Sequence, residues 1–203
     1  MADLDAFLPL AQSGLDGCLN DVLRDAVRDA SIQFMKETQL LTNDIKVNVR
    51  LGKKAYTLSP PDGLAWIVEN IQRDGEDLDE TNRDDYIDAK MHAETAQPTA
   101  YYIEGDGRLI LGPIPEADEQ LTGIVTVRPS DDATDLPDVL YTDWRRAIAA
   151  GARVFVRENF ASWDDPAKEA KDRAIFESAI NDAQKQRNKG RTRKRRRVVG
   201  QFF

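Results

Sequence analysis

Residues 144–152 read Trp144-Arg145-Arg146-Ala147-Ile148-Ala149-Ala150-Gly151-Ala152, a segment dominated by small residues from which the predicted architecture follows. Trp144, Ile148, Gly151 and Phe155 recur at heptad-like spacing, which predicts a helix from about Tyr141 to Asn159. Its face is made of small residues, so another helix can approach closely. We expect this face to pack within the subunit, and a contact between subunits is the alternative. The packing residues are Trp144, Ala147, Ile148, Gly151 and Phe155.

Two further helices are predicted on either side of this one. Asp165 can cap a following helix that begins at Pro166, a favoured first helical residue. Its apolar stripe is Ile175, Phe176, Ala179, Ile180 and Ala183, and Asn188 and Gly190 mark its expected end. Near the N-terminus, helical spacing predicts a helix over residues 17–37, with the stripe Leu15, Leu19, Val22, Leu23, Ala26, Ala30 and Phe34. Phe7, Leu8 and Leu10 surround Pro9 in what reads as an irregular segment packed on this helix.

Between these helices the apolar residues recur at every second position instead of at helical spacing. Ile45, Val47, Val49 and Leu51 alternate with polar residues, which indicates a half-buried strand, and residues 52–54 form a turn into a return strand over 55–58. Further strands are predicted over residues 64–72, 100–104, 108–111 and 121–128. A hairpin turn at 105–107 joins the second and third of these strands. The chain is also expected to bend at 74–75, to form a short helix over 84–90 and to continue as a polar linker over 130–137. Short strands with close turns suggest an antiparallel sandwich or small barrel.

The expected fold class is therefore α+β. A small helical bundle, made of one N-terminal and two C-terminal helices, holds an inserted antiparallel β-sandwich or barrel domain and ends in an extended C-terminal arm. We expect residues 1–43 to form the N-terminal helix of the bundle, 44–129 the β-domain, 130–190 the C-terminal helices and 191–203 a basic arm.

Charge is distributed unevenly along the chain, whose formal net charge is −8. Nine of the 28 basic residues lie from Lys185 onward, and none of the 36 acidic residues does. Such a tail can be a solubilising extension, a nuclear import signal, a phosphate-binding segment or an arm that folds on docking into a protein groove. The two terminal aromatic residues favour the docking arm, because aromatic anchors fill pockets. The candidate arm residues are Arg191, Arg193, Lys194, Arg195, Arg196, Arg197, Phe202 and Phe203.

Most catalytic chemistry is improbable for this sequence. His92 is the one histidine and Cys18 the one cysteine, and no glycine-rich phosphate loop sits between a strand and a helix. The acids between Asp74 and Asp88 lack the register of a calcium loop. They read as a solvated acidic loop, or as a patch that receives basic residues of a neighbouring subunit. We therefore expect no catalysis, no metal and no cofactor, and no apolar run is long enough to span a membrane.

Several segments, in order, resemble bacteriophage head-to-tail adaptor (connector) proteins. The resemblance is spread over nearly the whole chain, and its segments are residues 22–34, 98–104 with 107–109, 127–130, 144–152 and 162–166. Residues 144–152 and the Ser162-Trp163-Asp164-Asp165-Pro166 turn carry it most strongly. The chain departs from the expected pattern in its arginine-rich tail and its very acidic 74–88 loop.

The resemblance implies a structural virion protein at the head–tail junction, present in the host cytoplasm during assembly. It would form a ring, commonly of twelve subunits, below the portal protein, extend the DNA channel and offer a platform to a downstream tail or neck protein. The C-terminal arm would reach into the portal, and double-stranded DNA would pass through the ring. Two other classes stay open: a nucleic-acid-binding protein that uses the basic tail, and an enzyme with an unrecognised carboxylate site.

Overall fold

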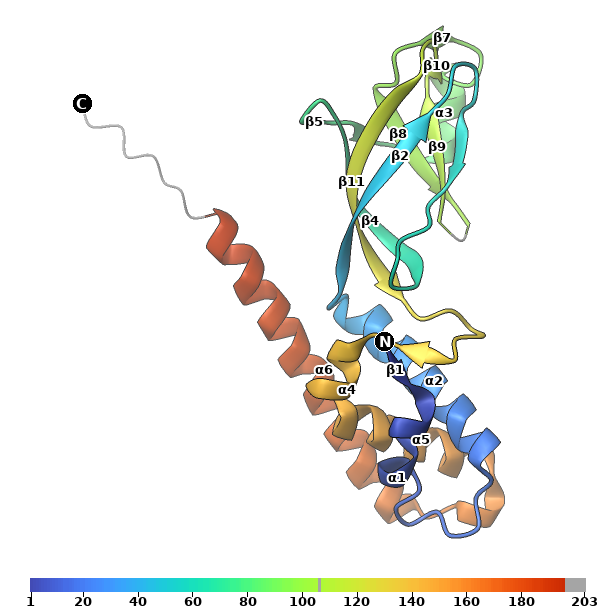
Figure 1. The fold of residues 1–203 in the computed structure, drawn as a ribbon, viewed down its shortest axis with the longest axis vertical. Coiled ribbons are helices and arrows are strands. Elements are labelled where there is room, and N and C mark those ends of the chain that lie inside the picture. Colours follow the sequence, from blue (N-terminus) through green and yellow to red (C-terminus); the bar gives the residue numbers. More distant parts are fainter. Residues whose placement is uncertain (106, 196–203) are drawn as a thin grey trace, which may run out of the picture. The chain divides into compact units, whose positions relative to one another are not determined.

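The chain divides into two compact units in a computed structural model that describes residues 1–105 and 107–195, with side chains described up to residue 189. The first, the helical unit, comprises Met1–Leu40 and Pro129–Phe203, and the second, the β-unit, comprises Leu41–Arg128 (Figure 1). The fold is mixed α+β. Among the described residues, no helix combines the length and the apolarity that crossing a bilayer requires.

Three long helices form the helical unit. They are α2 (Asn20–Thr38), α5 (Arg145–Asn159) and α6 (Pro166–Arg195), and each packs on the other two. This arrangement of one N-terminal and two C-terminal helices confirms the predicted bundle. The start of α6 is also as predicted, because the Lys168 N–H donates to Asp165 Oδ1 at 3.1 Å with Pro166 as the first helical residue.

Short elements surround these helices. They are β1 (Ala2–Asp3), the 3-10 turn η1 (Leu4–Ala6), α1 (Leu8–Ala11), β12 (Asp135–Leu136), α4 (Asp138–Thr142) and η2 (Ala161–Trp163). The segment around Pro9 is therefore a helical turn rather than irregular, since proline is tolerated at the start of a helix. The 130–137 segment is more than a polar linker, because β12 pairs antiparallel with β1 and Leu136 is fully buried.

The ends of the helices differ in part from the predictions. The helix expected from Tyr141 is two helices, since α4 ends at Thr142 and α5 begins at Arg145. The prediction that α6 ends near Asn188 or Gly190 is wrong, because its backbone stays helical to Arg195. A single glycine costs a helix interior only about 1 kcal/mol, and basic residues suit a helix C-terminus.

Four residues of the predicted helical stripes lie outside the core, and one of them is Val22 of α2, which is half-buried. Leu19 is 71% exposed, because it is the residue before the first turn of α2 rather than part of its buried face. Ile175 is 41% exposed and Ala179 is half-buried, whereas Phe176, Ile180 and Ala183 are buried as expected. The apolar face of α6 that α2 and α5 cover is therefore narrower than its sequence indicates.

The β-unit contains two four-stranded sheets. The first sheet has the order β2 (Thr42–Val49), β11 (Glu119–Arg128), β4 (Leu64–Arg73) and β5 (Glu76–Asp77). The second has the order β3 (Ala55–Thr57), β9 (Arg108–Gly112), β8 (Ala100–Glu104) and β6 (Asp79–Glu80). The short helix α3 (Arg83–Asp88) follows β6, and a further pair joins β7 (Thr95–Ala96) to β10 (Ile114–Pro115).

The strand pairings confirm some predictions and correct others. The β8–β9 hairpin forms as expected, with Glu104 opposite Arg108, although Asp106 of its turn lies outside the described residues. The predicted return strand does not pair with the strand before it, because β2 pairs with β11 and β3 pairs with β9. The sheets are not wholly antiparallel either, since β6–β8 and β7–β10 are parallel pairs.

Candidate assembly sites

The small-residue face of α5 lies at the centre of the helical unit. Ala147, Ile148 and Gly151 are buried, Trp144 is 9% exposed, and Phe155 is half-buried. A Cβ atom built on Gly151 would lie 2.8 and 2.9 Å from two ring carbons of Phe176 on α6 and 3.1 Å from the Ala30 Cβ on α2. The close approach that the small residues permit is therefore made by helices of the same subunit.

Trp144 joins α4 to this core. Its ring packs against Phe34 of α2 with 5.3 Å between ring centroids, and Phe34 also contacts Phe176 of α6 at 6.0 Å. The indole Nε1 is buried without a hydrogen-bond partner. Trp144 therefore acts mainly through apolar packing, and it belongs to the interior of the unit rather than to an exposed anchor.

A buried ion cluster, Arg153–Arg157–Asp172, fastens α5 to α6. Arg153 donates two hydrogen bonds to the Asp172 carboxylate at 2.9 and 2.5 Å, and Arg157 donates a third. The side chains of Arg157 and Asp172 are only 2% and 10% exposed. Arg153 Nη1 also donates to the Leu10 carbonyl at 2.7 Å, which ties the N-terminal segment to the same cluster.

The electrostatics of this cluster favour the charged carboxylate. Burial alone would raise the pKa of Asp172, but the hydrogen bonds and charges of Arg153 and Arg157 outweigh burial and hold the pKa below its ordinary value. The sequence analysis missed all three residues. Their one visible signal is the pair of arginines four residues apart, which follows the small and apolar run 147–152 and is separated by the apolar residues 154–156.

An open hollow of about 640 Å³ lies on the surface between α5 and α6. Trp144, Ala147, Ile175 and Ala179 supply its apolar lining, and Arg146, Lys171, Asp143 and Asp182 are the charged residues of its wall. The exposure of Ile175 follows from this hollow. It is an apolar surface of the helical unit that no described residue of the same subunit covers.

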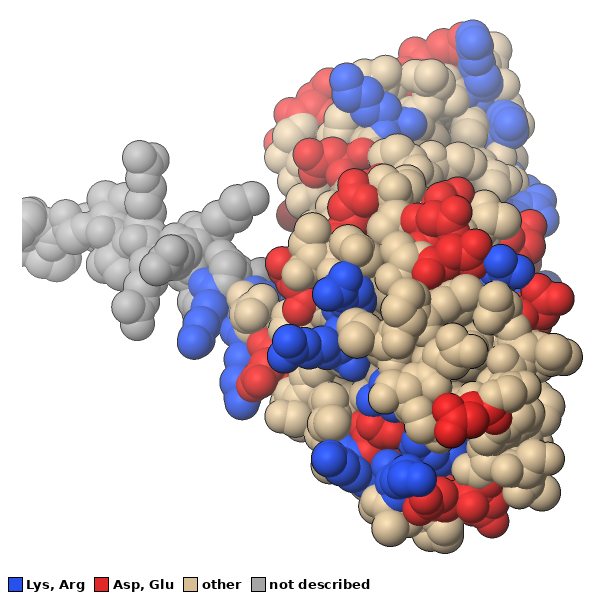
Figure 2. Space-filling view, turned by 60° about the horizontal axis from the view of Figure 1, so that its bottom comes forward, with Lys and Arg blue, Asp and Glu red and all other residues tan. Residues whose placement is uncertain are grey.

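The candidate arm residues fall at the end of α6 and beyond it. Arg191, Arg193, Lys194 and Arg195 belong to the last turns of the helix by their backbone, and Arg196, Arg197, Phe202 and Phe203 lie outside the described residues. Figure 2 shows basic side chains gathered beside the point where the described part of the chain ends. The last fully buried side chain of α6 before this point is Ala183.

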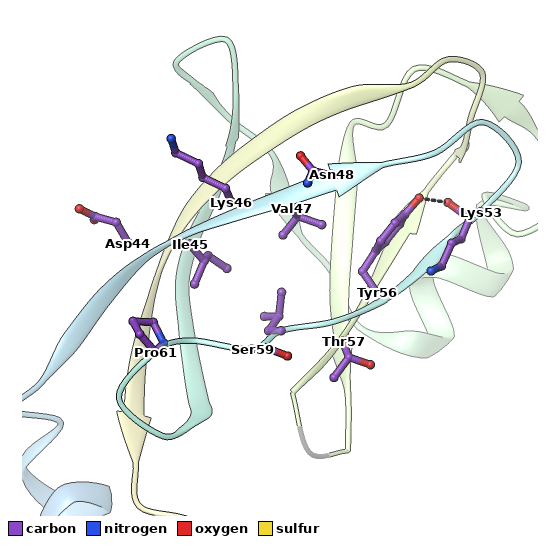
Figure 3. A pocket seen from close by; sticks show the side chains of 11 residues that line it. Asp44, Ile45, Lys46, Val47, Asn48, Lys53, Tyr56, Thr57, Ser59 and Pro61 are labelled. Atoms are coloured by element: carbon purple, nitrogen blue, oxygen red, sulfur yellow. Dashed lines mark hydrogen bonds between the residues drawn. The ribbon is translucent and has the colours of Figure 1, made fainter. Parts of the chain in front are cut away.

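The edge of the β-unit holds a groove of about 450 Å³ between β2 and the segment from Tyr56 to Pro61 (Figure 3). Ile45 and Val47 point from β2 toward this segment, whereas Lys46 points away. The Tyr56 hydroxyl anchors the opposite wall, because it donates to the Lys53 carbonyl at 2.5 Å and accepts from the Arg50 N–H at 2.9 Å. The sequence analysis did not identify this groove.

Three other groups were weighed above for catalysis or metal binding: Cys18, His92 and the acids between Asp74 and Asp88. Burial raises the pKa of the Cys18 thiol, which makes it a poor nucleophile. His92 lies beside the Tyr86 ring, with 6.5 Å between ring centroids. The acids between Asp74 and Asp88 are distributed over β5, β6 and α3, and within the described ranges they and the other metal-ligating residue types form no cluster that could hold a metal ion.

Comparison with known proteins adds one finding. A family model described as SU10 adaptor protein matches residues 1–199. No curated protein matches the chain. The matched range includes the whole β-unit and all of the described helical unit.

Proposed function

Since the chain belongs to the SU10 adaptor protein family, whose members are phage adaptors, we propose that it forms a ring below the portal protein. The ring extends the DNA channel and provides a platform for a downstream tail or neck protein, and the C-terminal arm docks into the portal. The family is structural rather than catalytic. The chain thus works in the virion through its contacts with other proteins and with the DNA that passes through.

The docking proposal is supported by the length of α6, which continues well beyond the last of its described side chains that is fully buried. The helix has 30 residues, Ala183 is the last of its described side chains that is fully buried, and Gln184 donates to the Glu37 carbonyl of α2 at 3.0 Å. The eleven residues from Lys185 to Arg195 continue the helix by about three turns and carry seven positive charges. A basic helical extension followed by an aromatic end suits capture of a partner.

Two variants of the chain test this docking through their binding to purified portal protein. Replacing Arg193, Arg195 and Arg197 with glutamine keeps good helix formers but removes three charges, so association should slow by about tenfold or more at low salt and depend less on salt. Replacing Phe202 and Phe203 with alanine should leave association unchanged and speed dissociation, because each buried phenylalanine contributes about 1.5–3 kcal/mol that salt does not screen. Surface plasmon resonance separates the two rates, and electron microscopy of the complex shows whether a ring forms.

The basic residues also favour a second candidate, binding of nucleic acid by the tail. In that case the glutamine variant should bind generic duplex DNA far more weakly, and its salt slope should become shallower by about 0.9 for each phosphate-binding arginine that is replaced. The alanine variant should bind DNA as the unmodified protein does.

Portal binding that is unchanged in both the glutamine variant and the alanine variant would contradict docking through the arm.

Removing residues 191–203 should leave the stability of the protein almost unchanged. The described core residues of the helical unit all precede this segment, and Ala183 is the last of them. We expect the melting temperature and the circular dichroism per remaining residue to match those of the full chain, apart from the helical signal of residues 191–195. A cooperative loss of structure would mean that the arm is part of the core.

A further inference from the structure

The three-helix groove, a hollow of about 390 Å³ in the helical unit, is lined by residues of α2, α5 and α6. Its floor is apolar, and Phe155 is half-buried there while the other floor residues are buried. The floor residues are Ala30, Gly151, Val154, Phe155, Phe176 and Ile180. Its charged lining residues are Asp29, Glu37, Glu158, Glu177 and Arg173, so negative charges exceed positive ones by three. The groove therefore offers apolar contact beside unbalanced negative charge.

The positive charge in this lining is already engaged. Arg173 donates to Glu158 and, at 2.8 Å, to Glu169, which does not line the groove. Asp29 of α2 and Glu177 of α6, in contrast, are exposed and have no hydrogen bond and no ion pair within the described residues. Burial raises the pKa of Asp29, and the negative charges of two neighbouring aspartates add to this rise. A positively charged segment in the groove would therefore gain at both carboxylates.

The C-terminal arm of the chain complements this groove in both charge and apolar character. Residues 191–203 contain six basic residues and no acidic one, and they also contain Val198, Val199, Phe202 and Phe203. Basic side chains pair with carboxylates, and their aliphatic stems lie readily along apolar surface. The chain therefore carries both a groove with net negative charge and a segment that is suited to fill it.

Helix α6 keeps the arm of each copy away from the groove of that same copy. Its backbone is helical to Arg195, so Glu177 and Arg191 lie about 21 Å apart along the axis. The chain can turn back only after Arg195, which lies about 27 Å from Glu177, and the two residues up to Arg197 span at most about 7 Å. The basic residues of one copy therefore cannot reach its own Glu177, whereas a second copy can present its groove to them.

We propose that the three-helix groove binds the C-terminal arm of a second copy of this chain. Basic residues of the arm pair with Asp29 and Glu177, and its apolar residues cover Phe155 and the floor beside it. Each copy has one arm and one such groove, so the contact is head-to-tail and can continue from copy to copy. The inference goes beyond docking into the portal, because it concerns the protein without portal protein and makes groove and portal compete for the same arm.

Sedimentation velocity of the full chain, without portal protein, tests the proposal. The unmodified protein should associate more at higher concentration, and added salt should weaken the association because it screens exposed charges. The groove variant, Asp29→Lys with Glu177→Lys, should associate at least about tenfold more weakly, since each exposed ion pair contributes up to about fivefold and the new lysines repel the arm. The control variant, Asp44→Lys with Glu76→Lys, makes the same change of net charge at exposed positions of the β-unit and should associate as the unmodified protein does.

Mixing two variants shows whether the arm and the groove that meet belong to different copies. The arm variant replaces Arg193, Arg195 and Arg197 with glutamate and should lose self-association as the groove variant does. Its groove is intact, and the groove variant has an intact arm, so the mixture should form a one-to-one complex that grows no further. A single chain with both sets of changes has the two charges exchanged and should recover self-association.

The variants should keep their helical circular dichroism, because lysine and glutamate are good helix formers. If the groove variant does not fold, Asp29→Gln with Glu177→Gln removes the same two charges without reversing them. The effect of salt on the unmodified protein then gives a second measurement of the same contact.

Several results would overturn the proposal. An unmodified protein that stays monomeric at every concentration at low salt would mean that no second copy occupies the groove. Equal weakening in the control variant would attribute the association to net charge rather than to the groove. A mixture of the groove and arm variants that does not associate would exclude an exchange of arms between copies. Self-association that the groove variant retains, together with a loss of its portal binding, would make the portal protein the occupant.

Discussion

Replacing Asp172 with asparagine should lower the free energy of unfolding by about 3–5 kcal/mol, because it removes the one negative charge from a buried cluster. Arg157 would keep its charge with a side chain that is only 2% exposed. Arg153 would keep its bond to the Leu10 carbonyl but lose the charge that balances it. Urea unfolding, followed by circular dichroism, measures the difference between the variant and the unmodified protein.

Two further variants show whether the loss arises from the uncompensated charge. Adding Arg157→Met to the asparagine variant should recover part of the stability, since an apolar side chain of similar volume does not need a partner charge. Glu158→Gln serves as the control, because the Arg173–Glu158 pair is exposed and should contribute less than about 1 kcal/mol. Equal losses from Glu158→Gln and Asp172→Asn would contradict a special role for the buried cluster.

Acid should remove the same stabilisation from the unmodified protein. The pKa of Asp172 lies below its ordinary value of 3.8 in the folded state, so the folded state releases this proton more readily than the unfolded chain. The stabilisation is therefore fully present above about pH 4 and decreases as the pH falls through the folded pKa. The difference in stability between Asp172→Asn and the unmodified protein should shrink over that range.

Local sequence signals were enough to predict the three long helices. Apolar residues at helical spacing identify α2, α5 and α6, and Asp165 with Pro166 places the start of α6 at the right residue. The signals were less informative about burial. Ile175 has the correct spacing for the core of α6, but it faces a hollow, because helical periodicity does not tell how wide a face the neighbouring helices cover.

Strand partners and the candidate sites depend on contacts between distant residues. The turn after β2 indicates a hairpin with β3, yet β2 pairs with β11, whose paired residues lie 70 or more positions later. Arg153, Arg157 and Asp172 have the composition of a solvated surface, and only the packing of α5 on α6 buries them. The three-helix groove likewise combines residues of α2, α5 and α6, which only the packing of these helices brings together.

Replacing Gly151 with leucine should destabilise the isolated protein toward the upper end of the roughly 1–3 kcal/mol that overpacking costs. Even the first added carbon would come within 2.8 Å of the Phe176 ring and 3.1 Å of the Ala30 Cβ, and leucine adds three more. Gly151→Ala is the informative intermediate. In an open helix it would gain about 1 kcal/mol from propensity, so a net loss of stability would measure the contact itself.

A control variant at Ser178 and a second change at Phe176 show whether the loss of stability comes from the packing around Gly151. Ser178→Leu adds a similar side chain to an exposed position on α6 and should change stability by no more than about 0.5 kcal/mol. Phe176→Leu removes the ring that Gly151 contacts, so its combination with Gly151→Ala should cost less than the sum of the two single changes. Because both partners of Gly151 belong to its own subunit, the loss must appear in the purified, unassembled protein. A Gly151→Leu variant that is stable in isolation but fails to assemble would instead place this face between subunits and remove it from the core of the bundle.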